Sequence, residues 1–278
     1  MAFFKHLLIK KNLLNNNAFI WNSKKNTINS IKKINTINLD LIVCIERQKK
    51  TLLENTRNFS IGNFTNNALL WGTRGNGKST LLKSVMGLIS PSSGVIGLEA
   101  DGQRTELIGK KTEEIVEMGI AMVPEGRRLF SLLSVEENLM LGAYRDVARK
   151  KIHDNLDFCF TTFPRLKERR KQQAGSLSGG EQQMVAVARS LMSNPSILLV
   201  DEPSVGLAPI LVSQMISKIK ELKEMKNLTV LMAEQNFNQA IKIADRGYVI
   251  VHGKMALSGE SAKALSENEL VKQYYLGV

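Results

Sequence analysis

Cysteine and histidine are scarce in this 278-residue chain, and their scarcity excludes several kinds of site. The two cysteines, Cys44 and Cys159, lie in unrelated contexts without metal-ligand spacing, which favours buried or incidental thiols over a disulfide or a zinc site. The three histidines, His6, His153 and His252, are scattered, and we expect them at the surface. The sequence therefore gives no support to histidine-based metal chemistry, and it is consistent with a reducing, cytosolic compartment.

Long hydrophobic runs are also missing. No run reaches the roughly 18 uninterrupted apolar residues that suggest a membrane-spanning helix. Lys5 and Lys10 interrupt the N-terminus too early for the apolar core of a secretory signal. With 43% hydrophobic and 23% charged residues, the composition is typical of a soluble globular protein of one or two domains. If the function involves a membrane, we expect another subunit to supply the span.

Acidic residues are rare only in the first quarter of the chain. Residues 1 to 67 contain 11 Lys or Arg and 3 Asp or Glu, which leaves 38 − 11 = 27 basic and 26 − 3 = 23 acidic residues for the remainder. A basic segment can contact nucleic acid or anionic lipid, but this one lacks the interleaved aromatic side chains on which bases stack. We therefore predict no nucleic-acid partner.

Composition changes sharply near residue 67. Asn, Lys and Ile dominate residues 1–67, where neither strand nor helix periodicity persists, and we predict little regular structure there. From residue 68 onward, strand and helix patterns alternate, which predicts an α/β domain over residues 68–278 with a largely parallel sheet. The pattern predicts a helix over residues 78–88. It predicts short buried strands at residues 68–71, 120–123, 197–200, 228–232 and 248–251.

A helical pattern replaces this alternation between about residues 134 and 176. It begins with Ser134 and Glu137, which are spaced as a capping box, and continues through Leu139, Leu141 and Ala143. We predict a separate helical lobe for this segment.

A glycine-rich loop follows the first of these strands. The segment Gly72-Thr73-Arg74-Gly75-Asn76-Gly77-Lys78-Ser79 satisfies G-x-x-x-x-G-K-[ST] and lies between an apolar strand and a helix. Glycines allow backbone N–H groups to surround phosphate oxygens, and the helix N-terminus adds partial positive charge. We predict that Lys78 contacts the β- and γ-phosphates of ATP and that Ser79 binds Mg²⁺. A glycine turn that only caps a helix is the alternative, and the strand–loop–helix context disfavours it.

Two adjacent carboxylates end a later strand. Asp201 and Glu202 follow the apolar run 197–200, at the strand end where open α/β sheets bind ligands. We predict that Asp201 holds Mg²⁺ through water and that Glu202 orients and polarises the attacking water. An Asp-Glu-Pro turn is common, so the pair is informative only together with the phosphate loop.

A second glycine motif starts another helix. Ser178 and Glu181 form a predicted capping box, with Gly179 and Gly180 between them. A cap alone does not need two glycines, whereas close approach of an anion to the helix N-terminus does. In a chain that already has a phosphate loop, this second anion site most simply faces the nucleotide of another subunit.

Together these segments resemble the ABC transporter ATPases over residues 69 to 278. Residues 72–80, ending at Thr80, are similar to the Walker A loop, residues 177–183 to the ABC signature, and residues 197–202 to Walker B with its catalytic Glu. Other segments resemble the smaller ATPase subunit of branched-chain amino acid importers: 123–130, 134–139, 163–170, 201–209, 233–236 and 244–248. The resemblance implies a P-loop NTPase fold with a helical lobe, and ATP and Mg²⁺ as ligands.

The same resemblance implies an assembly. It implies pairing with a second ABC ATPase subunit, docking on two membrane permease subunits at the cytoplasmic face of the inner (plasma) membrane, and indirect dependence on a soluble substrate-binding protein. A urea or amide importer ATPase shares most of these motifs and remains an alternative, because the segment 125–128 favours the amino acid branch only moderately.

Three positions depart from the general ABC pattern. Glu125 stands where most members have Gln, Gln235 where a switch His is usual, and Ala208 where an Asp is usual. All three fit the branched-chain subfamily. The resemblance thus assigns Glu125 to ATP binding and Gln235, which can donate to the γ-phosphate but carries no charge, to catalysis beside Glu202.

The N-terminal segment departs further. The family has an antiparallel strand pair with an aromatic that stacks on adenine, whereas residues 47–56 contain no aromatic, and Trp71 stands where the strand usually runs directly into glycine. We hypothesise that residues 1 to about 67 are out-of-frame or otherwise replaced sequence. An inactive ABC ATPase with a damaged N-terminus is therefore a further alternative to the importer.

Overall fold

A computed structural model describes residues 19–22, 27–30, 68–100, 103–259, 261–269 and 271. The chain divides into two compact units, residues 1–45 and 46–278. In the first unit β1 (Phe19–Asn22) pairs antiparallel with β2 (Thr27–Ser30), a hairpin that the sequence pattern does not predict. Cys44 and the segment 47–56, which contains no aromatic residue, lie outside the described residues.

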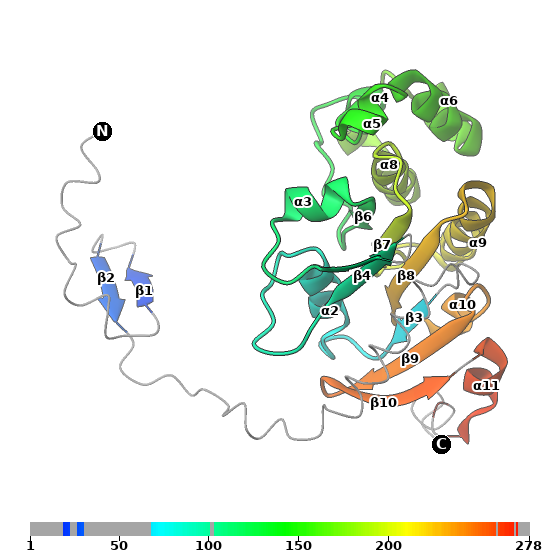
Figure 1. The fold of residues 1–278 in the computed structure, drawn as a ribbon. Coiled ribbons are helices and arrows are strands. Elements are labelled where there is room, and N and C mark those ends of the chain that lie inside the picture. The colour runs from blue at the N-terminus through cyan, green and yellow to red at the C-terminus, as the bar shows by residue number, and fades with distance from the viewer. Residues whose placement is uncertain are drawn as a thin grey trace. The chain divides into compact units, whose positions relative to one another are not determined.

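A six-stranded sheet organises the second unit, in the order β10-β9-β3-β8-β7-β6 (Figure 1). All neighbouring pairs are parallel except β10 with β9. The strands are β3 (Ala68–Trp71), β6 (Ile120–Val123), β7 (Ile197–Asp201), β8 (Thr229–Glu234), β9 (Arg246–Val251) and β10 (Lys254–Gly259). A separate hairpin joins β4 (Gly97–Ala100) to β5 (Gln103–Glu106). The predicted α/β fold with a largely parallel sheet is confirmed.

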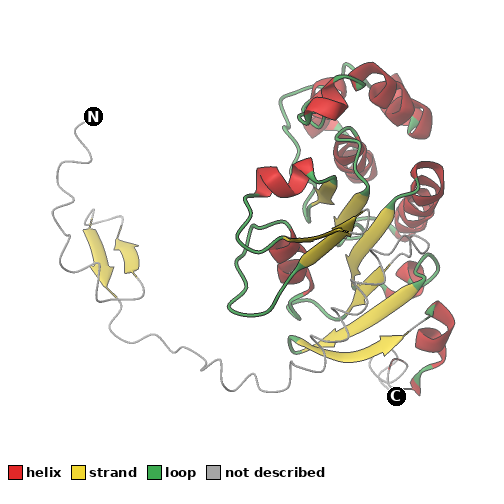
Figure 2. Ribbon diagram, viewed as in Figure 1, coloured by secondary structure: helices red, strands yellow, loops and turns green. Residues whose placement is uncertain are grey.

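Hydrophobic cores cover both faces of this sheet. Alternation along β3 sends Ala68 and Leu70 into one core, together with Leu82 of α2 (Lys78–Val85) and Ile115 of α3 (Thr112–Glu117). Leu69 and Trp71 enter the opposite core, which α8 (Gly179–Leu191) and α9 (Pro209–Lys226) cover. Figure 2 shows the strands between these helices. A strand buried on both faces reads as a continuous apolar run, which is why the central strands are visible in the sequence.

Short helices fill the region predicted as a helical lobe. They are α4 (Val135–Met140), α5 (Asp146–Arg149), α6 (Ile152–Thr162), α7 (Pro164–Glu168) and the 3-10 turn η2 (Ala174–Ser176). Helices α4, α6 and α7 contact α8. Ser134 caps α4 in the predicted box, since its Oγ accepts from Glu137 N and the Glu137 carboxylate accepts from Ser134 N.

Some predicted boundaries are wrong. The helix predicted over residues 78–88 ends at Val85, because Gly87 adopts a φ of 69° and Leu88 N donates to the carbonyl oxygen of Lys83, a bond that closes the helix end. β8 covers residues 229–234 instead of the predicted 228–232, and β9 covers residues 246–251 instead of the predicted 248–251. β4, β5 and β10 were not predicted, because their half-exposed residues form no apolar run. The described part of this unit also contains two short helices, α10 (Phe237–Ala240) and α11 (Ala262–Glu267).

Cys159, His153 and His252 lie as expected. Cys159 is a buried free cysteine, and burial raises the pKa of its thiol to about 12, so the thiol is protonated and inert at neutral pH. His153 and His252 are exposed. Among the described residues, no helix is both long and apolar enough to span a bilayer.

Candidate active site

The phosphate loop leaves the C-terminal end of β3 and enters α2. Gly75 and Gly77 have φ values of 85° and 88°, which glycine adopts without strain, and a Cβ at either position would meet no atom within 4 Å. The backbone conformation, not lack of space, therefore requires these two glycines. Gly72 is different, because a Cβ there would collide with the carbonyl oxygen of Ile250.

Side chains hold the loop in this shape. Asn76 Nδ2 donates to Thr73 Oγ1 at 2.8 Å, and Asn76 Oδ1 accepts from His252 N at 3.0 Å. These two bonds tie the middle of the loop to its own start and to the turn between β9 and β10. The loop is thus preorganised to present its N–H groups to an anion at the start of α2.

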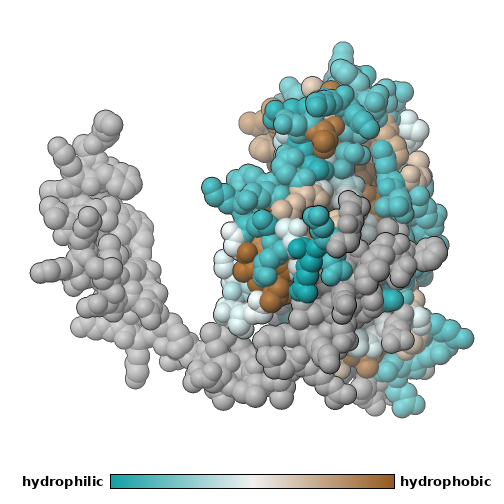
Figure 3. All heavy atoms as spheres, in the orientation of Figure 1, coloured by the Kyte–Doolittle hydropathy of each residue, from teal (hydrophilic) through white to brown (hydrophobic). Residues whose placement is uncertain are grey.

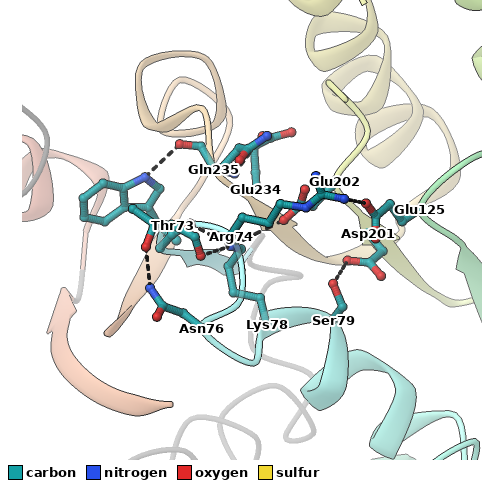
Figure 4. Close-up of polar contacts among 12 residues, drawn as sticks. Thr73, Arg74, Asn76, Lys78, Ser79, Glu125, Asp201, Glu202, Glu234 and Gln235 are labelled. Atoms are coloured by element: carbon teal, nitrogen blue, oxygen red, sulfur yellow. Dashed lines mark hydrogen bonds and ion pairs between the residues drawn. The ribbon is translucent and has the colours of Figure 1, made fainter. Parts of the chain in front are cut away.

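Lys78 is the buried cation of the site. Its side chain is 2% exposed, and Nζ donates to the carbonyl oxygens of Gly72 at 2.6 Å and Thr73 at 3.0 Å. Nζ also lies 3.5 Å from Glu202 Oε1 (Figure 4). The ammonium is therefore fixed inside the loop, between the expected phosphates and the predicted catalytic carboxylate.

Asp201 and Glu202 complete the site from β7. Ser79 Oγ donates to Asp201 Oδ1 at 2.7 Å, which brings together the two residues predicted to bind Mg²⁺. Asp201 Oδ2 and Glu202 Oε2 are buried and have no hydrogen-bond partner among the residues that the structure describes. Buried polar atoms are nearly always paired, so unpaired carboxylate oxygens beside a lysine and a serine are suited to a ligand, and they fit a hard cation and a water molecule.

Burial governs the protonation of both carboxyls. It raises the pKa of Asp201, against the hydrogen bond from Ser79, and it raises the pKa of Glu202, against the attraction of Lys78. Glu202 also adopts a φ of 45°, an uncommon conformation for a residue with a side chain. Local backbone strain of this kind clusters at functional sites.

Arg74, Glu125 and Gln235 lie around this centre. Arg74 Nη2 is 3.3 Å from Glu125 Oε1, and the Arg74 side chain is 78% exposed. Gln235 is exposed and follows β8, whose residue Ala233 accepts a hydrogen bond from Glu202 N at 2.8 Å. The structure thus brings Lys78, Ser79, Asp201 and Glu202 into direct contact and places the other three residues at the edge.

The signature residues lie at the start of α8. Ser178 Oγ accepts from Glu181 N, Glu181 Oε2 accepts from Ser178 N at 3.0 Å, and Arg169 Nε lies 2.9 Å from Glu181 Oε1. The predicted capping box is confirmed. Gly180 has a packing reason as well, because a Cβ there would lie 3.0 Å from Leu211 Cδ1. In the described part of the chain, no hydrogen bond or ion pair joins Ser178–Glu181 to the phosphate loop.

Two residues at the site were not predicted to act there. Glu234 is fully buried at the end of β8, and the Trp71 indole is buried at the end of β3. The sequence could have indicated Glu234, because it is a charged residue at the end of an apolar strand. For Trp71, the only indication in the sequence is its unusual place directly before the glycine loop.

Comparison with known proteins identifies relatives over most of the chain. Residues 46–205 match the ABC transporter family model, and this match begins inside the segment 1–67. The chain is 46% identical over 208 residues to the high-affinity branched-chain amino acid transport ATP-binding protein BraG of Pseudomonas aeruginosa, covering 75% of this chain and 86% of BraG. It is 37% identical over 207 residues to a probable branched-chain amino acid transport ATP-binding protein, LivF, of Archaeoglobus fulgidus, covering 74% and 85%.

A solved structure has the same fold. An ATP-binding cassette in a dimeric, post-hydrolysis state bound to ADP and Pi superposes with a TM-score of 0.59 at 25% identity, covering 70% of this chain and 85% of that one. The family match covers more than half of the chain, and BraG is matched over most of its length. The chain therefore belongs to the ABC transporter family, as an ATP-hydrolysing member that resembles the branched-chain amino acid transport ATPases.

Proposed function

We propose that this chain hydrolyses ATP to power the import of branched-chain amino acids through a membrane ABC transporter. The observation that carries the choice of solute is the 46% identity with BraG over 75% of the chain. The contacts among Lys78, Ser79, Asp201 and Glu202 supply the chemistry on which such a subunit depends.

The site residues divide this chemistry among them. Residues 72–80 surround the phosphates of ATP, with Lys78 supplying the charge that compensates the β- and γ-phosphates. Glu202 orients and polarises the attacking water, and the pKa of its carboxyl is raised by burial, which strengthens it as a base. Gln235 donates its side-chain amide to the γ-phosphate, and Glu125 lies beside the nucleotide.

Ser79 and Asp201 would hold Mg²⁺. Magnesium needs only one or two protein oxygens, because phosphate and water fill its other positions, and it neutralises phosphate charge when bound. The described residues accordingly contain no group of three or more His, Cys, Asp or Glu that could hold a metal by itself. The pair joined by the Ser79–Asp201 hydrogen bond is the matching donor set.

The signature serves a second subunit. Ser178 and Glu181 form hydrogen bonds with each other. Within the described part of the chain, the first N–H groups of α8 remain available and the phosphate loop has no bond to these residues. We infer that residues 178–181 bind the ATP of a paired ABC ATPase, so that two chains build two composite sites. The solved cassette dimer that matches this fold supports such pairing.

An apolar surface on the helical lobe fits a membrane partner. Large hydrophobic side chains are exposed there, and Figure 3 shows brown patches on this lobe. They are Leu132, Met140, Leu141, Tyr144 and Val147, which are between 45% and 83% exposed. Exposed apolar patches mark interaction sites. We infer a peripheral position at the cytoplasmic face of the plasma membrane, where the chain docks on two permease subunits. A soluble binding protein delivers the substrate to these permeases.

Reconstitution tests the solute. The chain would be assembled in liposomes with permease, ATPase and binding-protein subunits of a branched-chain amino acid importer. ATP and Mg²⁺ would be supplied on the side of the membrane where the ATPase subunits lie. We expect ATP-dependent uptake of labelled leucine and none with a Glu202→Gln chain. Uptake of urea or amides instead would replace the proposed solute, and absence of ATP turnover would favour the inactive alternative.

A further inference from the structure

Trp71 connects the phosphate loop to the turn that carries Gln235. It is the last residue of β3, directly before Gly72, and it is 5% exposed. Its Nε1 donates to the carbonyl oxygen of Gln235 at 3.1 Å, across 164 residues of sequence. Its ring also meets the Phe237 ring edge-on, with 5.1 Å between centroids. Because the ring is buried, it is not available to stack on adenine.

Glu234 binds the same turn from the other side. Its Oε1 accepts from Gln235 N at 2.7 Å, Asn236 N at 2.9 Å and Ser204 Oγ at 2.7 Å. Its Oε2 accepts from Ser204 N at 3.2 Å. One buried carboxylate therefore joins the turn after β8 to the segment that follows Glu202.

Gln235 thus has a fixed main chain and a free side chain. Its N–H is bound by Glu234 and its carbonyl oxygen by Trp71, whereas its exposed side-chain amide has no hydrogen-bond partner among the described residues. We propose that Trp71 and Glu234 are positioning residues, which hold the Gln235 backbone so that its amide meets the γ-phosphate of ATP. The proposal rests on the contact of Gln235 with ATP proposed above.

The physical reason lies in where Trp71 is attached. An aliphatic side chain at this position would pack in the same core but could not donate to Gln235. The indole instead joins Gln235 to the residue directly before the phosphate loop. The positions of Lys78 and Gln235, the two groups proposed to contact the γ-phosphate, are thereby coupled through Trp71. Misplacement of a contacting group by about 1 Å can cost two orders of magnitude in rate.

Removal of the indole N–H tests the proposal in the purified full-length chain. Trp71→Phe keeps an aromatic ring beside Phe237 and deletes the donor, together with part of the buried ring volume. We expect kcat for Mg-ATP hydrolysis to fall about tenfold, while affinity for AMP-PNP stays within about twofold, because the bound phosphates contact the unchanged loop. If Trp71→Phe does not fold, β-(3-benzothienyl)alanine at position 71 replaces the N–H by sulfur at nearly constant shape.

A double-mutant cycle with Gln235→Ala decides whether Trp71 acts through Gln235. We expect Gln235→Ala to lower kcat and Trp71→Phe to change kcat by less than about twofold in that background. Losses that multiply, or a Trp71→Phe chain with wild-type kcat, would overturn the positioning proposal alone. Wild-type kcat in Gln235→Ala would overturn the contact of Gln235 with ATP, and the positioning proposal with it.

Discussion

β7 and β8 are neighbouring parallel strands that place buried carboxylates at the same edge of the sheet. The carboxylates of the two strands differ in their hydrogen bonding. Glu234 ends β8 and accepts four hydrogen bonds through its two oxygens. Asp201 ends β7 and Glu202 follows it, and each has one oxygen that no described residue contacts by a hydrogen bond. All three residues are at most 6% exposed.

We infer that the difference separates a structural carboxylate from the acid pair proposed to act in catalysis. A buried acceptor left unpaired costs stability, so selection for stability alone would remove it or satisfy it, as it has at Glu234. Asp201 and Glu202, at the end of β7, keep unpaired oxygens and therefore lower the stability of the fold. Their unpaired oxygens can bind a metal ion and a water molecule, and burial raises the pKa of both carboxyls.

The largest expected effect is on catalysis. Glu202→Gln keeps the shape of the side chain and removes its basicity, so we expect the ATP hydrolysis rate to fall by about 10²–10⁴-fold while ATP binding persists. Steady-state turnover and AMP-PNP binding measure the two properties. Glu221→Gln, on the surface beside Lys218, is the matched control and should keep wild-type turnover. Unchanged turnover in Glu202→Gln would remove Glu202 from catalysis.

Glu234→Gln should lower the stability of the fold, because the carboxylate that it replaces is fully hydrogen-bonded. The new Nε2 donor faces Ser204 N or the N–H groups of Gln235 and Asn236, which leaves buried donors unpaired. We expect the free energy of unfolding, measured in urea, to fall by about 1–3 kcal/mol. A Glu234→Gln chain as stable as the wild type would show that its four hydrogen bonds contribute nothing.

Asp201→Asn should instead raise the stability of the fold. Asparagine can still accept from Ser79, and it removes a charge that burial disfavours. Without nucleotide or Mg²⁺ at neutral pH, we expect Tm to rise by about 2–4 °C, the shift that roughly 1 kcal/mol produces in a chain of this size. Differential scanning calorimetry measures it. An unchanged or lower Tm would contradict the view that the acid pair is kept for function at the expense of stability.

The smallest expected effect is a pH dependence of that difference. Because the folded-state pKa of Asp201 is raised, the stability it contributes is present below its unfolded pKa, about 4, and is lost as pH rises through the folded value. The Tm advantage of Asp201→Asn should therefore be small in acid and grow toward neutral pH. A Tm difference that does not vary with pH would mean that Asp201 is not the titrating group.

Much of the site was predictable because its motifs are local. The glycines at 75 and 77, the capping boxes at Ser134 and Ser178, and the acids after an apolar strand each follow from the chemistry of a few consecutive residues. The conformation of Glu202 and the packing of Gly180 against Leu211 were not predictable, because they depend on neighbours that are distant in sequence.

Local sequence patterns were thus sufficient to predict the fold class, the phosphate loop and the acid pair, whereas the family was predicted from the resemblance of these motifs to those of known ATPases. Tertiary structure alone decided which carboxylates remain free and how Gln235 is held. Whether Glu234 or Glu202 finds donors depends on Ser204 and on the strand order β3-β8-β7, and the Trp71–Gln235 bond spans 164 residues. A sequence pattern records which groups can form hydrogen bonds, but only packing determines which of them meet.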